Sequence, residues 1–384
     1  MVYMPRATLR IGATAAAGMI AVCAVVVAIR FRSDESPRVA QDVAIAGRLA
    51  RATPGDDQAV HAGQADELAA APATAIIPCL SAFGSATPAG ENWLRHALDR
   101  AAQRLGPELK VSALEAFART ATQPARARSL AFAWLKARDV GRADALLKNL
   151  LDDPALDLRR AAVEQLLASA DGTDEANQKR VYQRALAAAR DLDQIERIAG
   201  WLGEHGAPVD IAALLGIIRH WKVSGAFDNT GGAGFARVDP PESGGSPPDT
   251  TGWKEVTSAD KLGLVDLNSA VTRKKEVLAY ALAEVEMPRA QSADVRITST
   301  CAVVVWVNGV KVMAHEIYHA GRSFDQYVAS AEFRQGRNAV LVKCCQNEQA
   351  EWWAEDWHFS LRICDRSGKP VATTVTGGGD ALPR

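Results

Sequence analysis

The stretch AVVVWVNGVKV, residues 302–312, decides the fold of the C-terminal part of this chain. Two runs rich in β-branched residues flank Asn308-Gly309, a dipeptide that favours the type I′ turn because both of its central residues need a positive φ. The stretch therefore predicts a β-hairpin. Other candidate strands surround it at the spacing of an all-β sandwich: VLAYALAEVEM from 277, the run from Asp294 into the hairpin, NAVLVKCCQ from 338 and WHFSLRICD from 357.

The stretch WKVSGAFDNTGGAGFARVDPPE, residues 221–242, marks the start of this all-β region. Helical periodicity stops at Trp221, and Gly-Gly and Pro-Pro punctuation takes over. We expect a β-sandwich over residues 222–375, followed by a frayed tail over 376–384. The acidic Asp228, Asp239 and Glu242 match no defined calcium loop, and their expected roles are capping and turn formation.

Residues 91–221 have a different texture, with Ala- and Leu-rich segments of helical periodicity broken by prolines and glycines. They predict six to eight antiparallel helices. The segment ALLKNLLDDPALDLRRAAVEQLLASA resembles one HEAT-type repeat, whereas its neighbours keep no regular period. An irregular α-solenoid and a compact helical bundle are both open, and such an array serves either as a concave binding surface or as a scaffold.

The N-terminal part predicts a membrane anchor and a spacer. Residues 11–29 form an uncharged apolar run between Arg10 and Arg30, about the length that spans a bilayer, and residues 1–32 are interpreted as a single-pass transmembrane anchor. A cleaved signal peptide is the alternative. Residues 33–90, rich in Ala, Pro, Gly, Asp and Gln, predict a disordered spacer. Arginines on both sides of the run leave the orientation open, and the soluble domains are expected to be extracytoplasmic.

Composition excludes some function classes. The 384 residues include 44 Lys and Arg against 45 Asp and Glu, and without a long basic run nucleic-acid binding is not expected. There is no CxxC pair, P-loop, GxSxG or Rossmann glycine pattern, so the sequence names no cofactor, no metal site and no nucleophile. The cysteines after Cys23 are either buried thiols or partners in disulfides.

The strands also carry a family resemblance. VWVNGVKV, FDQY, GRNAVLVK and WHFSLRICDRSGKP, in that order, resemble the galactose-binding-like jelly roll, similar to the sugar-binding domain of family 2 glycoside hydrolases. GAFDNTGGAGF followed by DPPE resembles modules placed after helical repeats in bacterial envelope proteins. The resemblance implies a jelly-roll sandwich and an accessory module, of a kind of which some bind glycans and many have no demonstrated ligand, and it implies no catalytic residue.

One motif points elsewhere. His315, Glu316 and His319 spell HExxH, the zinc-peptidase pattern, and Asp325 lies at the third-ligand position of some longer signatures. That chemistry needs a helix, because only the i, i+4 spacing of a helix brings both imidazoles to one zinc ion. Here the motif directly follows a predicted strand. A zinc-dependent hydrolase is therefore kept as the alternative function, with a loop role preferred for both histidines.

The aromatic residues give the candidate binding site. Trp357 and Phe359 alternate with apolar residues in a predicted strand and are assigned to the core. Trp352 and Trp353 precede that strand among carboxylates, so they suggest a stacking platform for a sugar with Glu351 beside it; a hydrophobic lid over the sandwich is the alternative. Trp253 is a second candidate platform or a peripheral core residue.

These patterns together predict a protein of α+β class: an N-terminal transmembrane helix, a HEAT-like helical region and a galactose-binding-like β-sandwich. We expect a non-catalytic binding or scaffold protein of the cell envelope, held in the membrane through residues 11–29 and recognising a glycan or a protein partner. The candidate ligand-binding residues are Trp253, Trp352, Trp353 and Glu351.

Overall fold

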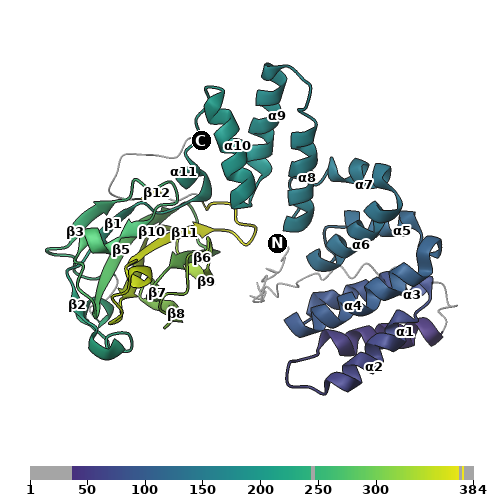
Figure 1. The fold of residues 1–384 in the computed structure, drawn as a ribbon, viewed down its shortest axis with the longest axis horizontal. Coiled ribbons are helices and arrows are strands. Elements are labelled where there is room, and N and C mark those ends of the chain that lie inside the picture. Colours follow the sequence, from purple (N-terminus) through teal and green to yellow (C-terminus); the bar gives the residue numbers. More distant parts are fainter. Residues whose placement is uncertain (1–36, 244–246, 372–373, 376–384) are drawn as a thin grey trace, which may run out of the picture.

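The computed structural model describes residues 37–243, 247–371 and 374–375. The chain is α+β, with eleven α-helices over 37–215 followed by two antiparallel sheets and two short helices within the described part. Figure 1 shows the helices following one another in an arc whose last members lie against the sheets. The predicted change from helices to strands is confirmed: α11 (Ile211–Leu215) is the last helix before the first strand, and β1 begins at His220.

The helical region begins far earlier than the sequence suggested. Helices α1 (Pro37–Ala50), α2 (Gln58–Ala69) and α3 (Ala73–Leu80), with a 3₁₀ turn at Ser81–Ser85, pack with α4 (Pro88–Leu105). The disordered spacer predicted over 33–90 is therefore wrong for the described residues 37–90. Alanine is the best helix former, and at helical spacing it lets helices approach closely around a few large side chains. The small number of large apolar residues in this segment therefore did not prevent folding. The fully buried residues include Ile45, Leu49, Leu68, Ile76 and Leu80.

The remaining helices continue the arc, each in contact with the next along the chain. They are α5 (Val111–Arg119), α6 (Ala125–Arg138), α7 (Val140–Leu147), α8 (Leu156–Ala168), α9 (Glu175–Ala188), α10 (Leu192–Glu204) and α11. Arg160 and Glu164 of α8 do not pair with each other as a helix-surface pair would; Arg160 binds Asp193, and Glu164 binds Arg197, both on α10. Ion pairs thus link successive helices. This sequential packing is compatible with a solenoid, while the HEAT-like assignment itself stays a prediction.

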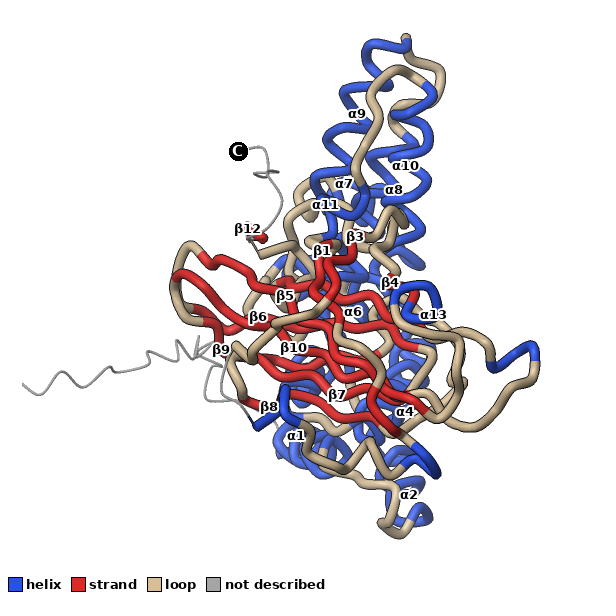
Figure 2. Tube along the Cα trace, turned by 90° about the vertical axis from the view of Figure 1, so that its left-hand side faces the viewer, coloured by secondary structure: helices blue, strands red, loops and turns tan. Residues whose placement is uncertain are grey.

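Two antiparallel sheets form the C-terminal sandwich. The larger has the order β3-β1-β5-β10-β7-β8, with β2 and β12 also paired to β5, and the smaller has the order β4-β11-β6-β9. Figure 2 shows the larger sheet with loops crossing its outer face. The strands are β1 (His220–Val223), β2 (Phe227–Asp228), β3 (Lys254–Thr257), β4 (Val265–Asp266), β5 (Val277–Met287), β6 (Gln291–Ser299), β7 (Ala302–Val307), β8 (Val310–His315), β9 (Tyr327–Phe333), β10 (Gly336–Cys345), β11 (His358–Cys364) and β12 (Thr374–Val375).

The predicted hairpin is confirmed. Asn308 and Gly309 have φ values of 51° and 81°, and Val307 pairs with Val310 across the turn. The side chains that alternate inward from both sheets form the core, with Trp357 and Phe359 fully buried in it. The other face of β5 is buried as well, under the segment that carries η3 (Thr230–Gly232) and α12 (Pro240–Ser243). This double burial explains why VLAYALAEVEM is nearly apolar throughout.

Helices and sandwich meet at a continuous junction. After α11 the chain passes directly onto the smaller sheet, where the Ile218 amide donates to the carbonyl of Leu361 (2.9 Å) and Ile217 forms a β-bridge with Arg362. Ile217, Leu262 and Phe324 join the apolar cluster of α9–α11. Gly216 ends α11 at φ 69°, where a Cβ would lie 2.8 Å from Pro370 Cβ. The two parts therefore share buried surface.

Two predictions concern residues that the structure does not describe. The apolar run 11–29 and the tail 376–384 lie outside the described residues. Among the helices that are described, none has both the length and the apolar character needed to cross a bilayer. Cys79, Cys301, Cys344, Cys345 and Cys364, the cysteines of the described part, are all free and buried, which favours the buried-thiol interpretation.

Candidate functional site

An open cleft of about 560 Å³ lies at the end of the sandwich where β11 begins. Short elements surround it: β4 and α13 (Leu267–Ala270) on one side, and the segment before β11 on the other. Polar side chains dominate its lining, with acidic, basic and amide groups together: Asp266, Asn268, Arg273, Lys275, Arg322, Glu355, Asp356 and His358. Such a mixture offers both donors and acceptors to a polar ligand.

His358 sits at the base of the cleft and is buried. Burial lowers the pKa of His358 below its usual value, with nearby Arg322 adding to the effect and Asp356 opposing it. The ring is therefore neutral near pH 7. Its Nε2 lies 3.4 Å from Nη1 of Arg322 and its Nδ1 lies 4.0 Å from a carboxylate oxygen of Asp356. A tautomer with hydrogen on Nδ1 suits both neighbours, since guanidinium can only donate.

Some of the other charged groups of the cleft already have hydrogen-bond partners in the protein, and others do not. Asp266 caps α13 by accepting from the amides of Asn268 and Ser269, and Lys275 donates to the carbonyl of Ala354 (2.8 Å). Among the described residues, Arg273 makes no hydrogen bond or ion pair, and neither does the carboxylate of Glu355. Arg273 and Glu355 thus remain open to a ligand at the cleft, in addition to Arg322, whose hydrogen-bond partner is the His358 ring.

Two tryptophans lie on η4 (Trp352–Ala354), in the segment between Ala350 and Glu355; those two residues line the cleft, whereas the indoles are not among its lining residues. Trp352 is 84% exposed and Trp353 is 48% exposed, whereas the sequence predicts exposure of at least one of the two indoles. The ring of Trp353 meets the ring of His319 edge to face, with centroids 5.3 Å apart. Glu351, also exposed, precedes η4, and the Ala354 amide donates to its carbonyl (2.8 Å). Neither indole covers the core, which disfavours the lid interpretation.

Trp253, the fourth candidate, lies elsewhere. It is half-buried in the loop before β3, where it packs on the aromatic cluster that covers the outer face of the larger sheet, with Phe227, Phe235 and Tyr318. It does not line the cleft. The structure thus groups Trp352, Trp353 and Glu351 and separates Trp253 from them.

The HExxH residues do not form a helix. His315 is the last residue of β8 and stacks on Tyr327 (centroids 4.0 Å apart), whereas His319 has a φ of 56° and its Nε2 lies 2.9 Å from Oδ1 of Asn347. Asp325, the suggested third ligand, accepts from Arg362 and Arg296. In the described part of the chain, no cluster of three or more His, Cys, Asp or Glu is placed to hold a metal ion. The geometry required of a zinc peptidase is absent at this motif.

The acidic residues of the 228–242 segment have structural roles. Tyr280 and the buried Lys343 both bind Glu242, and Arg237 binds Asp239. Lys343 also donates to the carbonyls of Phe235 and Arg237. These contacts fasten the segment over the larger sheet, as a capping and turn role implies.

Sequence reasoning did not single out six polar residues of the cleft: Asp266, Asn268, Arg273, Lys275, Arg322 and His358. His358 lies in a strand whose neighbours are core residues, and Arg322 comes from a loop 36 residues away in sequence. A polar residue that interrupts an apolar strand, as in WHFSL, was the available signal for His358.

Neither a protein-family model nor a curated protein sequence matches this chain. Among solved structures, a family 35 carbohydrate binding module from an environmental isolate matches 42% of this chain and 99% of its own, at 13% identity and a TM-score of 0.22. A β-glucosidase from Kluyveromyces marxianus matches 76% of this chain and 38% of its own, at 9% identity and a TM-score of 0.25.

A third similar structure has a different activity in its description. An alkylpurine DNA glycosylase from Pseudomonas fluorescens, bound to DNA containing an abasic site analog, matches 88% of this chain and 96% of its own, at 10% identity and a TM-score of 0.22. The identities and TM-scores of all three are too low to establish a shared fold. Nothing is therefore transferred from these proteins to this chain.

Proposed function

We propose that this protein is a non-catalytic glycan-binding protein whose site consists of the cleft at the start of β11 and the indoles of Trp352 and Trp353. The observation that carries the proposal is the pair of exposed indoles beside a wide polar cleft. Indole faces stack on the apolar face of a sugar ring, and the amide, carboxylate and guanidinium groups of the cleft match hydroxyl groups.

The chemistry of the cleft supports binding over catalysis. Burial lowers the pKa of His358, its Nε2 contacts Arg322 (3.4 Å), and Asp266 is used as a helix cap. General acid–base hydrolysis needs a titrating pair poised on either side of a substrate bond, and no observation at the cleft favours such a pair. We retain the galactose-binding-like and HEAT-like assignments as part of this proposal, with the helical array presenting the sandwich.

The setting of the protein is proposed from the sequence. The apolar run 11–29 supports an anchor in the membrane, with the soluble domains outside the cytoplasm, in the cell envelope. The formal net charge of −1 supports a ligand other than nucleic acid. A protein partner for the helical array is the alternative, and it would be favoured if the protein retained no glycan.

The experiment is a glycan array probed with the full-length protein in detergent, with neutral and acidic oligosaccharides and single-stranded DNA on the same surface. Titration calorimetry with the strongest oligosaccharide then compares the wild type with Trp353→Ala and Trp352→Ala. We expect each substitution to weaken binding at least tenfold, or about 1.4 kcal/mol, because a stacking face is lost.

The matched control is Trp201→Phe on α10. Trp201 stacks between Tyr182 and His205, away from the sandwich, so its replacement keeps an aromatic ring there and leaves binding unchanged. Retention of no glycan by the wild type, or equal affinity of Trp352→Ala, Trp353→Ala and the wild type, would refute the proposal.

A further inference from the structure

A single loop connects the cleft with the junction between sandwich and helices. The loop comprises residues 316–326, between β8 and β9, and we call it the bridging loop. The loop is first held at His319. The His319 amide donates to the carbonyl of Thr300 (2.8 Å), Nε2 of His319 donates to Oδ1 of Asn347, and the imidazole contacts the ring of Trp353. This end of the loop therefore touches one of the two indoles of the proposed site.

The middle of the bridging loop forms part of the cleft wall. Arg322 lines the cleft and contacts His358. The next residue, Ser323, accepts a hydrogen bond at its carbonyl from Oγ1 of Thr298 on β6 (2.9 Å). A displacement of Arg322 by a ligand would therefore pull directly on the segment that follows.

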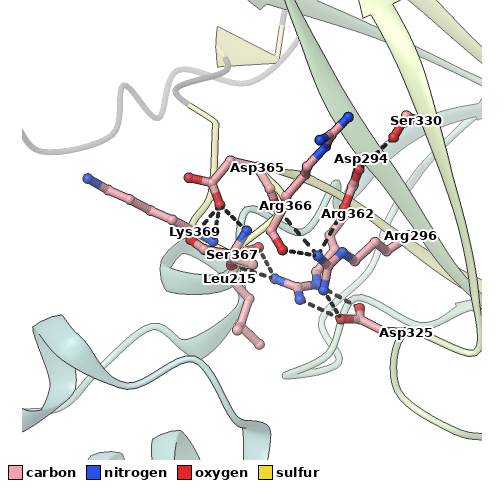
Figure 3. A network of polar contacts seen from close by, with 11 residues as sticks. Leu215, Asp294, Arg296, Asp325, Ser330, Arg362, Asp365, Arg366, Ser367 and Lys369 are labelled. Atoms are coloured by element: carbon pink, nitrogen blue, oxygen red, sulfur yellow. Dashed lines mark hydrogen bonds and ion pairs between the residues drawn. The ribbon is translucent and has the colours of Figure 1, made fainter. Parts of the chain in front are cut away.

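The far end of the bridging loop is clamped at the junction. Asp325 accepts from Nε of Arg362 (2.7 Å), from its Nη2 (2.5 Å) and from Nη1 of Arg296 (3.0 Å). Figure 3 shows Asp325 facing both guanidinium groups. Nη1 of the same Arg362 donates to the carbonyl of Leu215, the last residue of α11 (3.3 Å). Phe324 packs on the Arg362 guanidinium (4.8 Å) and on the apolar cluster of the last helices.

Strand β11 supports the loop at both contacts. His358 and Arg362 are four residues apart, so they project from the same face of the strand at a spacing of about 13 Å. The bridging loop meets them with Arg322 and Asp325, three residues apart. Both His319 and Asp325 hold a left-handed backbone (φ 56°) that non-glycine residues adopt only where surrounding contacts enforce it. If the contacts of His319 or of Asp325 are lost, we expect that residue to leave the left-handed conformation and the loop to change its path.

We propose that the bridging loop couples the cleft energetically to the docking of the helical array, so that a ligand in the cleft changes how firmly α11 is held. The identity of that ligand rests on the proposed function, whereas the coupling itself belongs to the unliganded protein. Coupling of this kind is reciprocal: a change at the junction alters the indole end of the loop, and a change at the indole end alters the junction.

Hydrogen–deuterium exchange on the full-length protein, without ligand, tests both directions. Asp325→Asn should raise the exchange rate of the His319 amide at least fivefold, although that amide lies at the opposite end of the loop. Trp353→Ala should raise the exchange rate of the Ile218 amide, which donates to Leu361 at the junction, by a similar factor. Arg322→Ala, at an exposed position, removes the middle contact and should affect both ends.

Two control variants match these changes. Trp352→Ala removes an indole that makes no ring contact with another described residue, and it should leave the Ile218 amide unchanged. Lys261→Ala breaks an exposed ion pair with Glu196 at the junction; such a pair adds little to the docking of the helices, so the His319 amide should be unchanged. Exchange that rises only near each substitution, with Arg322→Ala equally local, would overturn the coupling. Failure of the glycan array alone would overturn only the proposed ligand.

Discussion

Two arginines lie near the opposite ends of β11, and they differ in how many of their donors are bound within the protein. At the C-terminal end, the side chain of Arg362 is 3% exposed and each of its three nitrogens donates to a fixed acceptor: Asp325, Leu215 or Gly368. At the N-terminal end, Arg322 has the ring of His358 as its single hydrogen-bond partner among the described residues, and it lines the cleft. A guanidinium whose three nitrogens all donate to fixed acceptors holds elements together, whereas one with most donors left over is available to a ligand.

The largest effect is expected at the paired end. Arg362→Ala leaves Asp325 and Arg296 with an incomplete network and removes the contact to α11, so the free energy of unfolding should fall by about 3–5 kcal/mol. Urea denaturation followed by far-ultraviolet circular dichroism measures the change. The control is Arg160→Ala, which breaks an exposed pair (side chains 39% and 66% exposed) and should cost under about 1 kcal/mol. Equal losses would show that the junction network is no tighter than a surface pair.

A backbone substitution at the junction should have a smaller effect. Gly216→Ala imposes a Cβ on a left-handed residue and brings it against Pro370, so we expect a loss of about 1–3 kcal/mol in unfolding free energy. Gly206→Ala, also at positive φ (72°) but with nothing within 4 Å of the added Cβ, separates backbone strain from contact. If both variants lose the same stability, crowding at the junction contributes nothing.

The cleft end predicts a dependence of stability on pH. Burial lowers the pKa of His358 in the folded protein, so its contribution is complete above the unfolded value of about 6.5 and is lost as the pH falls through the folded value. Wild-type stability should therefore decline more steeply than that of His358→Gln between about pH 7.5 and about pH 5. Urea midpoints across that range measure it, and parallel curves for the two proteins would contradict it.

The smallest effect is expected at the exposed indole. Trp352→Ala should change the free energy of unfolding by less than about 0.5 kcal/mol, because the side chain is almost fully in water. Thermal melts give the value. Trp357→Ala is the contrasting variant, with a fully buried indole and an expected loss of about 3–5 kcal/mol. A marked loss in Trp352→Ala would indicate that this indole packs on the protein and is not free for a ligand.

Local signals were enough for the strands and too weak for the first helices. The segment VLAYALAEVEM coincides with β5, and Asn308-Gly309 forms the predicted hairpin between β7 and β8, because turn chemistry and β-branched runs act over a few residues. Residues 37–90 form helices because Ile45, Leu68 and Ile76 bury against one another, a tertiary effect that alanine-rich composition conceals. At the candidate site, the exposure of Trp352 and Trp353 followed from their charged neighbours.

The rest of the site depends on long-range contacts. Arg322 reaches His358 only because β9 and β11 both flank β6 in the smaller sheet, and no sequence pattern joins the two residues. From the sequence, Trp253 is an equal candidate for a platform role, and its packing against the buried cluster around Tyr280 and Trp306 distinguishes it. The HExxH motif is present in the sequence, but it begins at the end of β8 and does not form the helix that zinc binding by this motif requires.

The bridge between Ile217 and Arg362 also has a kinetic consequence. During synthesis the helices emerge first, yet the strand that receives the end of α11 is made 145 residues later. Contacts this distant in sequence close slowly, because the intervening chain must first be ordered. We therefore expect the helical array to acquire its structure early and its last turns, around α11, to wait for β11, so that this short segment is the one most accessible to chaperones and proteases in the growing chain.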